Sequence, residues 1–172
     1  MQNTFWCYYC FMLILGIDPG IARLGWGIIS FEKGNVKAVE YGCFETSAKL
    51  PEAERLKDLH CFLTKLINIH KPEVLSVEEL FFAANAKTAL TVGQARGVVI
   101  LTASLFDLPV SSYTPLQVKQ ALTGYGRAEK SQIQLMVKSI LKLNEIPKPD
   151  DAADALAIAI THAFSYKMGE KL

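Results

Sequence analysis

The sequence predicts a single α/β domain in which a mixed β-sheet carries helices on its faces. Three observations lead to this expectation: a length of 172 residues, three strand-like runs at the start, and alternating helical and strand-like runs in the remainder. A chain of this length can bury a substantial core, and a hydrophobic content of 51% argues against disorder. The net charge of +1 is too small to indicate a polyanionic partner by itself, so charge has to be considered locally.

Five apolar runs have the length and composition of β-strands, and they cover residues 12–18, 24–31, 36–44, 73–80 and 110–113. The first run is followed by Pro19-Gly20, as expected of a buried strand that ends in a turn. Lys33-Gly34-Asn35 separates the second run from the third and is typical of a hairpin turn. A hairpin-linked triplet followed by alternating units indicates a sheet with both antiparallel and parallel neighbours.

Five further segments carry helical signals, and they cover residues 53–70, 86–106, 115–122, 130–143 and 151–164. The first stops before Pro72, and the third starts with Pro115, a residue that helices accept in their first turn. Gly93 and Gly97 interrupt the second helix and flatten one of its sides. The last segment is rich in alanine, which predicts a helix that approaches the sheet closely.

The ends of the chain are expected to lie outside the domain. We expect residues 1–11 to be an extension without a role, residues 12–167 to form the domain, and residues 168–172 to be a short tail. The apolar run in residues 5–17 is shorter than the roughly 20 residues that span a bilayer, and it lacks the basic region of a signal peptide.

The cysteines point to a reducing cytoplasm. Cys7 and Cys10 could form half a zinc site or a redox pair, but the sequence has no second pair of cysteines or histidines to complete a zinc site. Cys43 and Cys61 are interpreted as small core residues. This usage is typical of a cytoplasmic protein.

Acidic residues stand at the ends of predicted elements; they are Asp18, Glu78, Asp150, Asp151 and Asp154. Each has a structural explanation when taken alone. Asp18 can hydrogen-bond into the turn that follows it, and Glu78 can lie at a solvated strand end. Asp150 and Asp151 can cap the last helix and complement its dipole. Capping explains Asp154 less well, because this residue is already inside the helix and shares a face with Asp151.

Taken together, the acids favour a metal site. Sites in open α/β sheets form at the ends of strands, and here two strand ends and one helix start carry carboxylates. Carboxylates gathered in one crevice repel one another, which divalent cations relieve. Ligation by oxygen alone suits Mg²⁺ or Mn²⁺. Two such ions about 3.5–4 Å apart serve the cleavage of phosphodiesters by in-line attack of water.

Long blocks of the sequence resemble the RuvC Holliday-junction resolvases; they are LGIDPG, SVEELFF, GQARGV, QVKQALTGYGRAEKSQ and DAADALAIAITHA. The resemblance covers about residues 13–167. It implies a ribonuclease-H-like fold and a homodimer with the helix at residues 86–106 in its interface. It also implies symmetric, Mg²⁺-dependent nicking of four-way (Holliday) DNA junctions in recombination and repair, with the RuvA–RuvB branch-migration complex as a partner.

The resemblance also assigns the acids. The family's four metal-binding carboxylates match Asp18, Glu78, Asp151 and Asp154, and the family's glutamate matches Glu78 rather than Glu79. The implied cofactor is Mg²⁺, with two ions in each active site, and Mn²⁺ is expected to substitute for it.

A basic stretch is the candidate DNA-binding surface. Residues 115–142 hold five basic residues against one acid, around the loop Gly124-Tyr125-Gly126. Such a stretch is often only a solvated helix face, yet phosphates are its natural partners. Arg127 is therefore expected to contact DNA. The resemblance places Lys119 and Lys130 beside the catalytic acids, where they would hold the scissile phosphate and offset charge in the transition state.

Phe81 and Phe82 follow the predicted fourth strand directly. Aromatic residues in this position are usually part of a core, but an exposed ring could stack on an unpaired base at the centre of a junction. The resemblance implies that role for an aromatic at position 81. Which of the two rings is exposed remains open.

Other functions stay open at this point. A related ribonuclease-H-like enzyme could cut RNA, although the long blocks at residues 128–132 and 151–157 argue against it. IDPG followed by Gly25 resembles the phosphate-binding hairpin of sugar kinases and actin, a fold that needs two such domains and therefore a longer chain. A junction-binding protein that does not cut is the last alternative, although it would not need all four acids.

Overall fold

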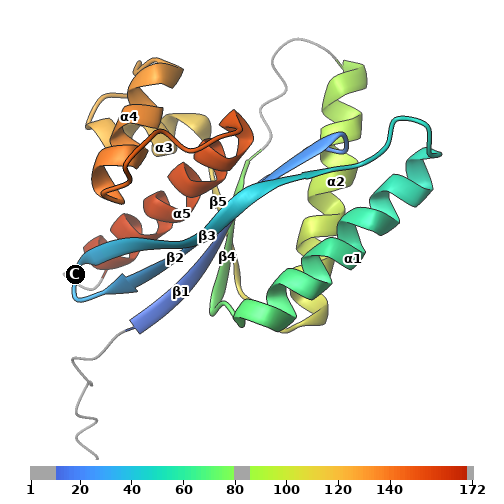
Figure 1. The fold of residues 1–172 in the computed structure, drawn as a ribbon, viewed down its shortest axis with the longest axis horizontal. Coiled ribbons are helices and arrows are strands. Elements are labelled where there is room, and N and C mark those ends of the chain that lie inside the picture. The colour runs from blue at the N-terminus through green and yellow to red at the C-terminus, as the bar shows by residue number, and fades with distance from the viewer. Residues whose placement is uncertain (1–10, 80–85, 170–172) are drawn as a thin grey trace, which may run out of the picture.

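The computed structural model describes residues 11–79 and 86–169, and it confirms the predicted α/β class. The sheet has five strands in the order β3-β2-β1-β4-β5. Strands β1 and β3 each pair with β2 in antiparallel fashion, whereas β4 pairs in parallel with β1 and with β5 (Figure 1). The sheet is therefore mixed, as predicted. The strands are β1 (Phe11–Asp18), β2 (Arg23–Glu32), β3 (Asn35–Glu45), β4 (Val74–Glu78) and β5 (Val110–Tyr113).

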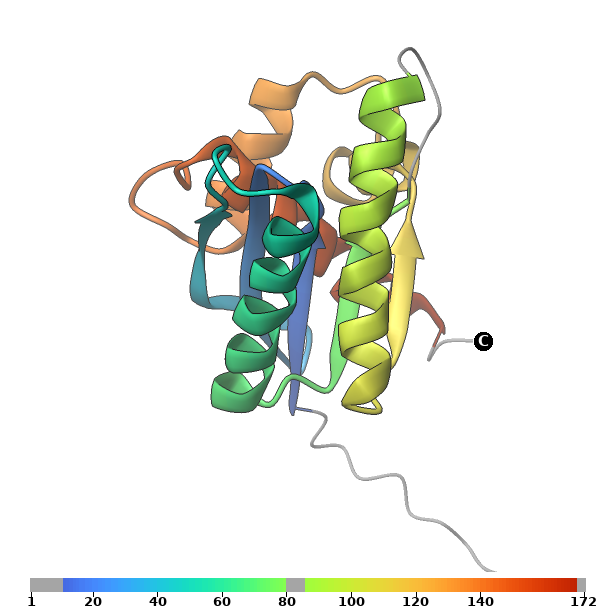
Figure 2. The same ribbon diagram turned by 90° about the vertical axis from the view of Figure 1, so that its right-hand side faces the viewer.

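Helices cover both faces of the sheet (Figures 1 and 2). One face carries α1 and α2, and the other carries α5, with α3 and α4 packed beside α5. The helices are α1 (Glu52–His70), α2 (Ala86–Leu105), α3 (Pro115–Thr123), α4 (Lys130–Ile140) and α5 (Asp150–Gly169). Over the ranges that the structure describes, none of them is long and apolar enough to cross a membrane.

Alternation along β1 divides the core in two. Ile14 packs with α5 and its neighbouring helices, whereas Leu15 and Ile17 pack with α1 and α2. Successive side chains of a strand point to opposite faces, so Asp18 lies on the same face as Ile14, the face covered by α5. The strand β4 follows the same rule: Val74 belongs to the α5 cluster and Val77 to the other cluster. Glu78 therefore also faces α5.

Several element ends differ from the prediction. Helix α4 ends at Ile140 rather than at residue 143, because Lys142 has a left-handed φ of 53° that a helix cannot continue. Helix α5 begins one residue early. The amide of Ala152 donates to the carbonyl of Pro149 over 3.0 Å, so Asp150 is the first helical residue rather than a cap outside the helix.

The prediction that both Cys43 and Cys61 are core residues is wrong for Cys61. This residue is exposed, because it lies on the outward side of α1 between Leu59 and Leu63, which are fully buried. Cys43 is partly buried on β3. The interpretation of Cys7 and Cys10 falls on residues that lie outside the described ranges.

Candidate active site

Helix α5 rests against the sheet with almost no clearance. A Cβ atom added at Gly16 of β1 would overlap the carbonyl oxygen of Ala155, and one added at Gly25 of β2 would overlap the carbonyl oxygen of Asp151. Ala155 and Ala159 are fully buried in this contact. We call this contact between Gly16 and Gly25 and the backbone of α5 the glycine seam. Because Gly25 stands opposite Asp18 in the sheet, the seam brings the first turn of α5 to Asp18.

Asp18 and Glu78 end two neighbouring parallel strands at the same level. Ile17 of β1 is in register with Val77 of β4, so the residues that follow them leave the sheet side by side. Both carboxylates point toward α5, whereas Glu79 is exposed. The register therefore brings together the acids that sequence reasoning assigned to two separate strands.

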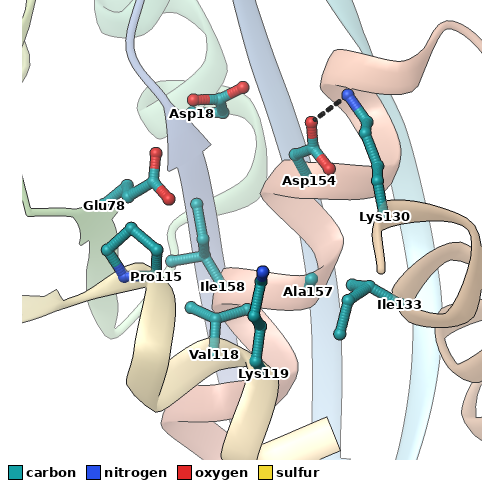
Figure 3. Close-up of a pocket in the computed structure, with 10 residues that line it drawn as sticks. All are labelled: Asp18, Glu78, Pro115, Val118, Lys119, Lys130, Ile133, Asp154, Ala157 and Ile158. Carbon is teal, nitrogen blue, oxygen red and sulfur yellow. Dashed lines mark ion pairs between the residues drawn. The ribbon is translucent and has the colours of Figure 1, made fainter. Parts of the chain in front are cut away.

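A pocket of about 220 Å³ lies between these strand ends, α3, α4 and α5. Its polar lining consists of Asp18, Glu78, Asp154, Lys119 and Lys130, and its apolar lining of Pro115, Val118, Ile133, Ala157 and Ile158 (Figure 3). Strand β5 ends beside Glu78, which pairs with Tyr113, and α3 starts two residues later. The fold thus carries Lys119 to the side of the pocket that faces Glu78.

The sheet acids are held in an unfavourable electrostatic environment. Burial raises the pKa of Asp18 to about 7, and repulsion from Glu78, Asp154 and Asp151 adds to the effect. Burial also raises the pKa of Glu78, followed by repulsion from Asp154. A group whose charged form is destabilised in this way gains from a cation placed beside it. The pair of strand ends is therefore suited to a positive ligand.

Asp154 is paired with a lysine. Lys130 Nζ lies 2.9 Å from Asp154 Oδ2 and 3.6 Å from Asp150 Oδ2. The ammonium group opposes the effect of burial, which nevertheless raises the pKa of Asp154 above its usual value. The same ion pair raises the pKa of Lys130, so this lysine is charged at neutral pH. In Figure 3 the carboxylate of Asp154 is joined to Lys130 across the pocket from Glu78.

Asp151 lies next to the pocket lining and has partners of its own. Arg23 Nε lies 3.4 Å from Asp151 Oδ2 and 3.2 Å from Glu45 Oε1. The thiol of Cys43 lies 3.9 Å from the same oxygen of Asp151. Sequence reasoning missed both Arg23 and Cys43 as neighbours of the acids, because they come from the strands β2 and β3 and no motif joins them to α5.

The donor set fits a hard divalent cation, with one adjustment. Within residues 11–79 and 86–169, no three His, Cys, Asp or Glu side chains are arranged to hold a metal ion as they stand. Figure 3 shows an oxygen of Asp154 joined to Lys130. Asp18 and Glu78 place carboxylate oxygens in the same pocket, and the pKa of each carboxyl group is raised. A turn of Asp154 toward them would complete an all-oxygen set of the kind that Mg²⁺ and Mn²⁺ prefer.

The predicted DNA contacts lie around this pocket where they can be located. Lys119 lines it and forms no ion pair within the described part of the chain. Arg127 is exposed on the connection between α3 and α4. Phe81 and Phe82 fall on residues 80–85, outside the described ranges, so their stacking role remains a prediction.

Arg96 is another residue that the prediction missed. It extends from α2 to the ends of two strands, where Nε donates to the carbonyl oxygen of Glu78 over 3.1 Å and a terminal nitrogen donates to Ser112 Oγ over 2.8 Å. These bonds fix the backbone from which the Glu78 side chain projects. The signal was present in the block GQARGV, in which a charged residue stands among small and apolar ones.

Comparisons with known proteins agree with this arrangement. A profile of the family described as crossover junction endodeoxyribonuclease RuvC matches residues 14–162. The chain is 56% identical over 155 residues to RuvC of Caldicellulosiruptor saccharolyticus, which covers 90% of this chain and 93% of that protein. It is 55% identical over 161 residues to RuvC of Pelotomaculum thermopropionicum, with 94% and 98% covered.

Solved structures give the same result. The chain matches Thermus thermophilus RuvC with a TM-score of 0.86 and 43% identity, over 92% of this chain and 97% of the other. The same protein in complex with a Holliday junction substrate matches with a TM-score of 0.84 and 40% identity, over the same shares. The yeast mitochondrial Holliday junction resolvase, at 17% identity and a TM-score of 0.67 over 91% and 80%, shows likeness of fold alone. These matches confirm the predicted ribonuclease-H-like fold, and the chain belongs to the RuvC family of crossover junction endodeoxyribonucleases.

Proposed function

We propose that this chain resolves four-way DNA junctions in recombination and repair, by nicking two strands symmetrically with divalent metal ions held by Asp18, Glu78, Asp151 and Asp154. The observation that carries the proposal is the convergence of two strand-end carboxylates and one helix carboxylate in a single pocket with Lys119 and Lys130. Family membership supports the reaction. The pocket supports the choice of Asp18, Glu78 and Asp154, and the choice of Asp151 rests on the family resemblance.

The proposed cofactor is Mg²⁺, with two ions in each active site and Mn²⁺ able to replace it. Ions bound there would supply activation of the attacking water and stabilisation of the leaving oxygen, giving 5′-phosphate and 3′-hydroxyl ends. The carboxylates supply hard oxygen ligands, and their raised pKa values indicate a site that gains from added positive charge. Lys119 and Lys130 hold the scissile phosphate and offset negative charge as the bond breaks.

The basic surface around α3 and α4 is proposed to bind the DNA backbone. Lys119 and Lys130 line the pocket, and Arg127 is exposed on the connection between α3 and α4. The Thermus thermophilus protein in complex with Holliday junction substrate is 40% identical to this chain, which supports junction binding here. Phe81 or Phe82 is proposed to stack on an unpaired base at the junction centre. Phosphate contacts supply affinity, and stacking supplies selectivity for the open junction.

A homodimer would place two active sites on one junction, as symmetric nicking requires. Helix α2 supports this assembly, because Leu90, Leu101 and Leu105 are 67%, 58% and 64% exposed. Leu101 and Leu105 are four residues apart and lie on one helix face with Gly97, which has open space beside it. An exposed apolar stripe of this kind is typical of an interaction surface.

The remaining assignments rest on family membership. We propose that the enzyme acts in the cytoplasm together with the RuvA–RuvB branch-migration complex. Residues 12–167 are proposed to be the functional domain, with residues 1–11 and 168–172 dispensable. The observed strand β1 begins at Phe11, so a truncation that removes only residues 1–10 leaves this strand whole.

A nicking assay tests the proposed function directly. A synthetic four-way junction, a linear duplex of the same sequence and an RNA–DNA hybrid are each incubated with the protein, with Mg²⁺ and with a chelator. We expect paired nicks in the junction alone and only with Mg²⁺. Cleavage of the hybrid in preference to the junction would favour the RNA-cutting alternative. Junction binding without cleavage would identify a protein that binds but does not cut.

A further inference from the structure

A protein cation already occupies part of the proposed metal site. Asp154 is the helix carboxylate that lines the pocket with Asp18 and Glu78, and its Oδ2 atom is bonded to Lys130 Nζ at 2.9 Å (Figure 3). The described residues lack a three-ligand group in this state. Asp154 lies in the pocket, and a lysine is its ion-pair partner there.

The backbone of Lys130 is fixed, whereas its charged end can move. Lys130 is the first residue of α4, and the amide before it, that of Glu129, donates to Gln132 Oε1 over 2.8 Å. Ala128 anchors the approach to the helix in the core. The side chain of Lys130 is nevertheless 55% exposed. A four-carbon stem on a fixed backbone can move its ammonium group from a carboxylate to a neighbouring phosphate.

We propose that Lys130 holds Asp154 away from the metal ions until DNA binds, so that loading of the divalent cation is coupled to binding of the junction. The inference rests on the proposed function. The ammonium group and a metal ion need the same carboxylate, so each weakens binding of the other. A DNA phosphate offers Lys130 a second negative partner and releases Asp154. Because such coupling is reciprocal, metal also tightens the binding of DNA.

Lys119 provides the internal contrast. It lines the same pocket and carries the same charge, but over the described residues it forms no ion pair with an acid. It therefore contributes positive potential without engaging a ligand. The two lysines are expected to differ in their effect on metal affinity, although both are proposed to contact the scissile phosphate.

Binding of Mn²⁺ to the DNA-free protein tests the inference without any reaction. The free ion is followed by electron paramagnetic resonance during titration of the wild type, Lys130→Met and Lys130→Arg. We expect about tenfold tighter binding for Lys130→Met, since the change removes a competing charge from a partly desolvated pocket. Lys130→Arg keeps the competing charge and is expected to stay close to the wild type.

Matched controls separate competition from other effects. Lys138→Met removes the same charge from the last turn of the same helix, away from the acids, and is expected to leave Mn²⁺ affinity within about twofold. Asp18→Asn is expected to lose Mn²⁺ binding in every background. Thermal unfolding verifies that each variant is folded, and Lys130→Gln replaces Lys130→Met if the latter does not fold.

The second half of the test adds DNA. A four-way junction with phosphorothioate linkages at its centre, which slow cleavage, is expected to tighten Mn²⁺ binding to the wild type more than to Lys130→Met. Equal Mn²⁺ affinities of the DNA-free wild type and Lys130→Met would overturn the inference, and so would equal tightening by DNA. Both results leave the proposed function intact as long as the wild type nicks junctions only with metal. Nicking without metal would instead contradict the proposed function.

Discussion

The two pairs of acids in the proposed active site are built in different ways. Asp18 and Glu78 end strands, and within the described residues neither forms an ion pair. Asp151 and Asp154 belong to a helix, and each is paired with a basic side chain, Arg23 or Lys130. The charged forms of the sheet pair are thus destabilised mainly by burial and lack a positive partner, whereas each acid of the helix pair already has a basic partner. The comparison indicates that the sheet acids would gain most from a bound cation. The helix acids already have basic partners, which a metal ion would have to displace.

The largest expected effect is common to both pairs. Asp18→Asn, Glu78→Gln and Asp154→Asn should each lower junction cleavage by several orders of magnitude, because an amide cannot replace a carboxylate in activating water through a metal. Junction binding should survive or tighten, since a negative charge beside the phosphates is lost. Single-turnover cleavage and gel-shift binding measure the two effects.

Asp150→Asn is the control, because Asp150 does not line the pocket. Cleavage by this variant should remain within about tenfold of the wild type, with a stability change of about 1 kcal/mol or less. If Asp154→Asn cuts at the normal rate, the acids on α5 serve only the helix start and the comparison fails.

The next largest effect is expected when the distance between the sheet pair and the helix pair is increased. Gly25→Ala places a methyl group against the backbone of Asp151 and must push α5 away from the sheet. Such overpacking costs about 1–3 kcal/mol, and the shift of both helix acids should lower cleavage by roughly ten- to a hundredfold. Chemical denaturation and cleavage rates measure the two effects. Gly97→Ala, at a helix position with open space, is the control for stability alone, because Gly97 lies on the proposed dimer face, and it should leave stability unchanged or slightly raised.

The pairs should also differ in how stability depends on pH without metal. The pKa of Asp18 rises from 3.8 to about 7 on folding, so its stabilising contribution is complete below pH 3.8 and is lost as pH rises through 7. Asp18→Asn should therefore match the wild type near pH 4 and exceed its stability at pH 8, by on the order of 3 kcal/mol. Asp154→Asn removes the nearer of the two acids paired with Lys130 and should show a smaller gain or a loss.

Thermal unfolding with a chelator at the two pH values measures this difference. Addition of Mg²⁺ should raise the melting temperature of the wild type at pH 8 and leave that of Asp18→Asn unchanged. A pH-independent difference between the two proteins would contradict the account of the sheet pair.

The smallest expected effect concerns Arg23. Arg23→Gln removes the cation beside Asp151, and because the pair is partly exposed the stability of the fold should change little. Cleavage should fall by a fewfold, since Asp151 loses a side chain that orients it. The affinity for Mn²⁺ should change by a similar factor. Lys57→Gln, in an exposed ion pair on α1, is the control and should alter neither quantity.

The sequence predicted the elements well and the partners poorly. Periodicity located the strands and helices within a few residues because it reports which face of an element is buried. It also indicated that only one of Glu78 and Glu79 faces the other acids, since adjacent strand residues point to opposite faces, and the family resemblance selected Glu78. It could not find the pairs Arg23–Asp151 and Lys130–Asp154, because each joins elements whose distance depends on the packing of α5. The exposure of Cys61 shows the same weakness at a single position.

The glycine seam fixes the distance between the two pairs of acids. The backbone of α5 leaves no room for even a single methyl group at Gly16 or Gly25. Substitutions there cannot accumulate one at a time, since any enlargement moves the helix and both of its acids together. Inherited variation should therefore collect on the other face of the sheet, where large side chains of α1 and α2 can exchange volume with their neighbours. The geometry of the proposed metal site is protected by the absence of side chains at Gly16 and Gly25 rather than by their presence.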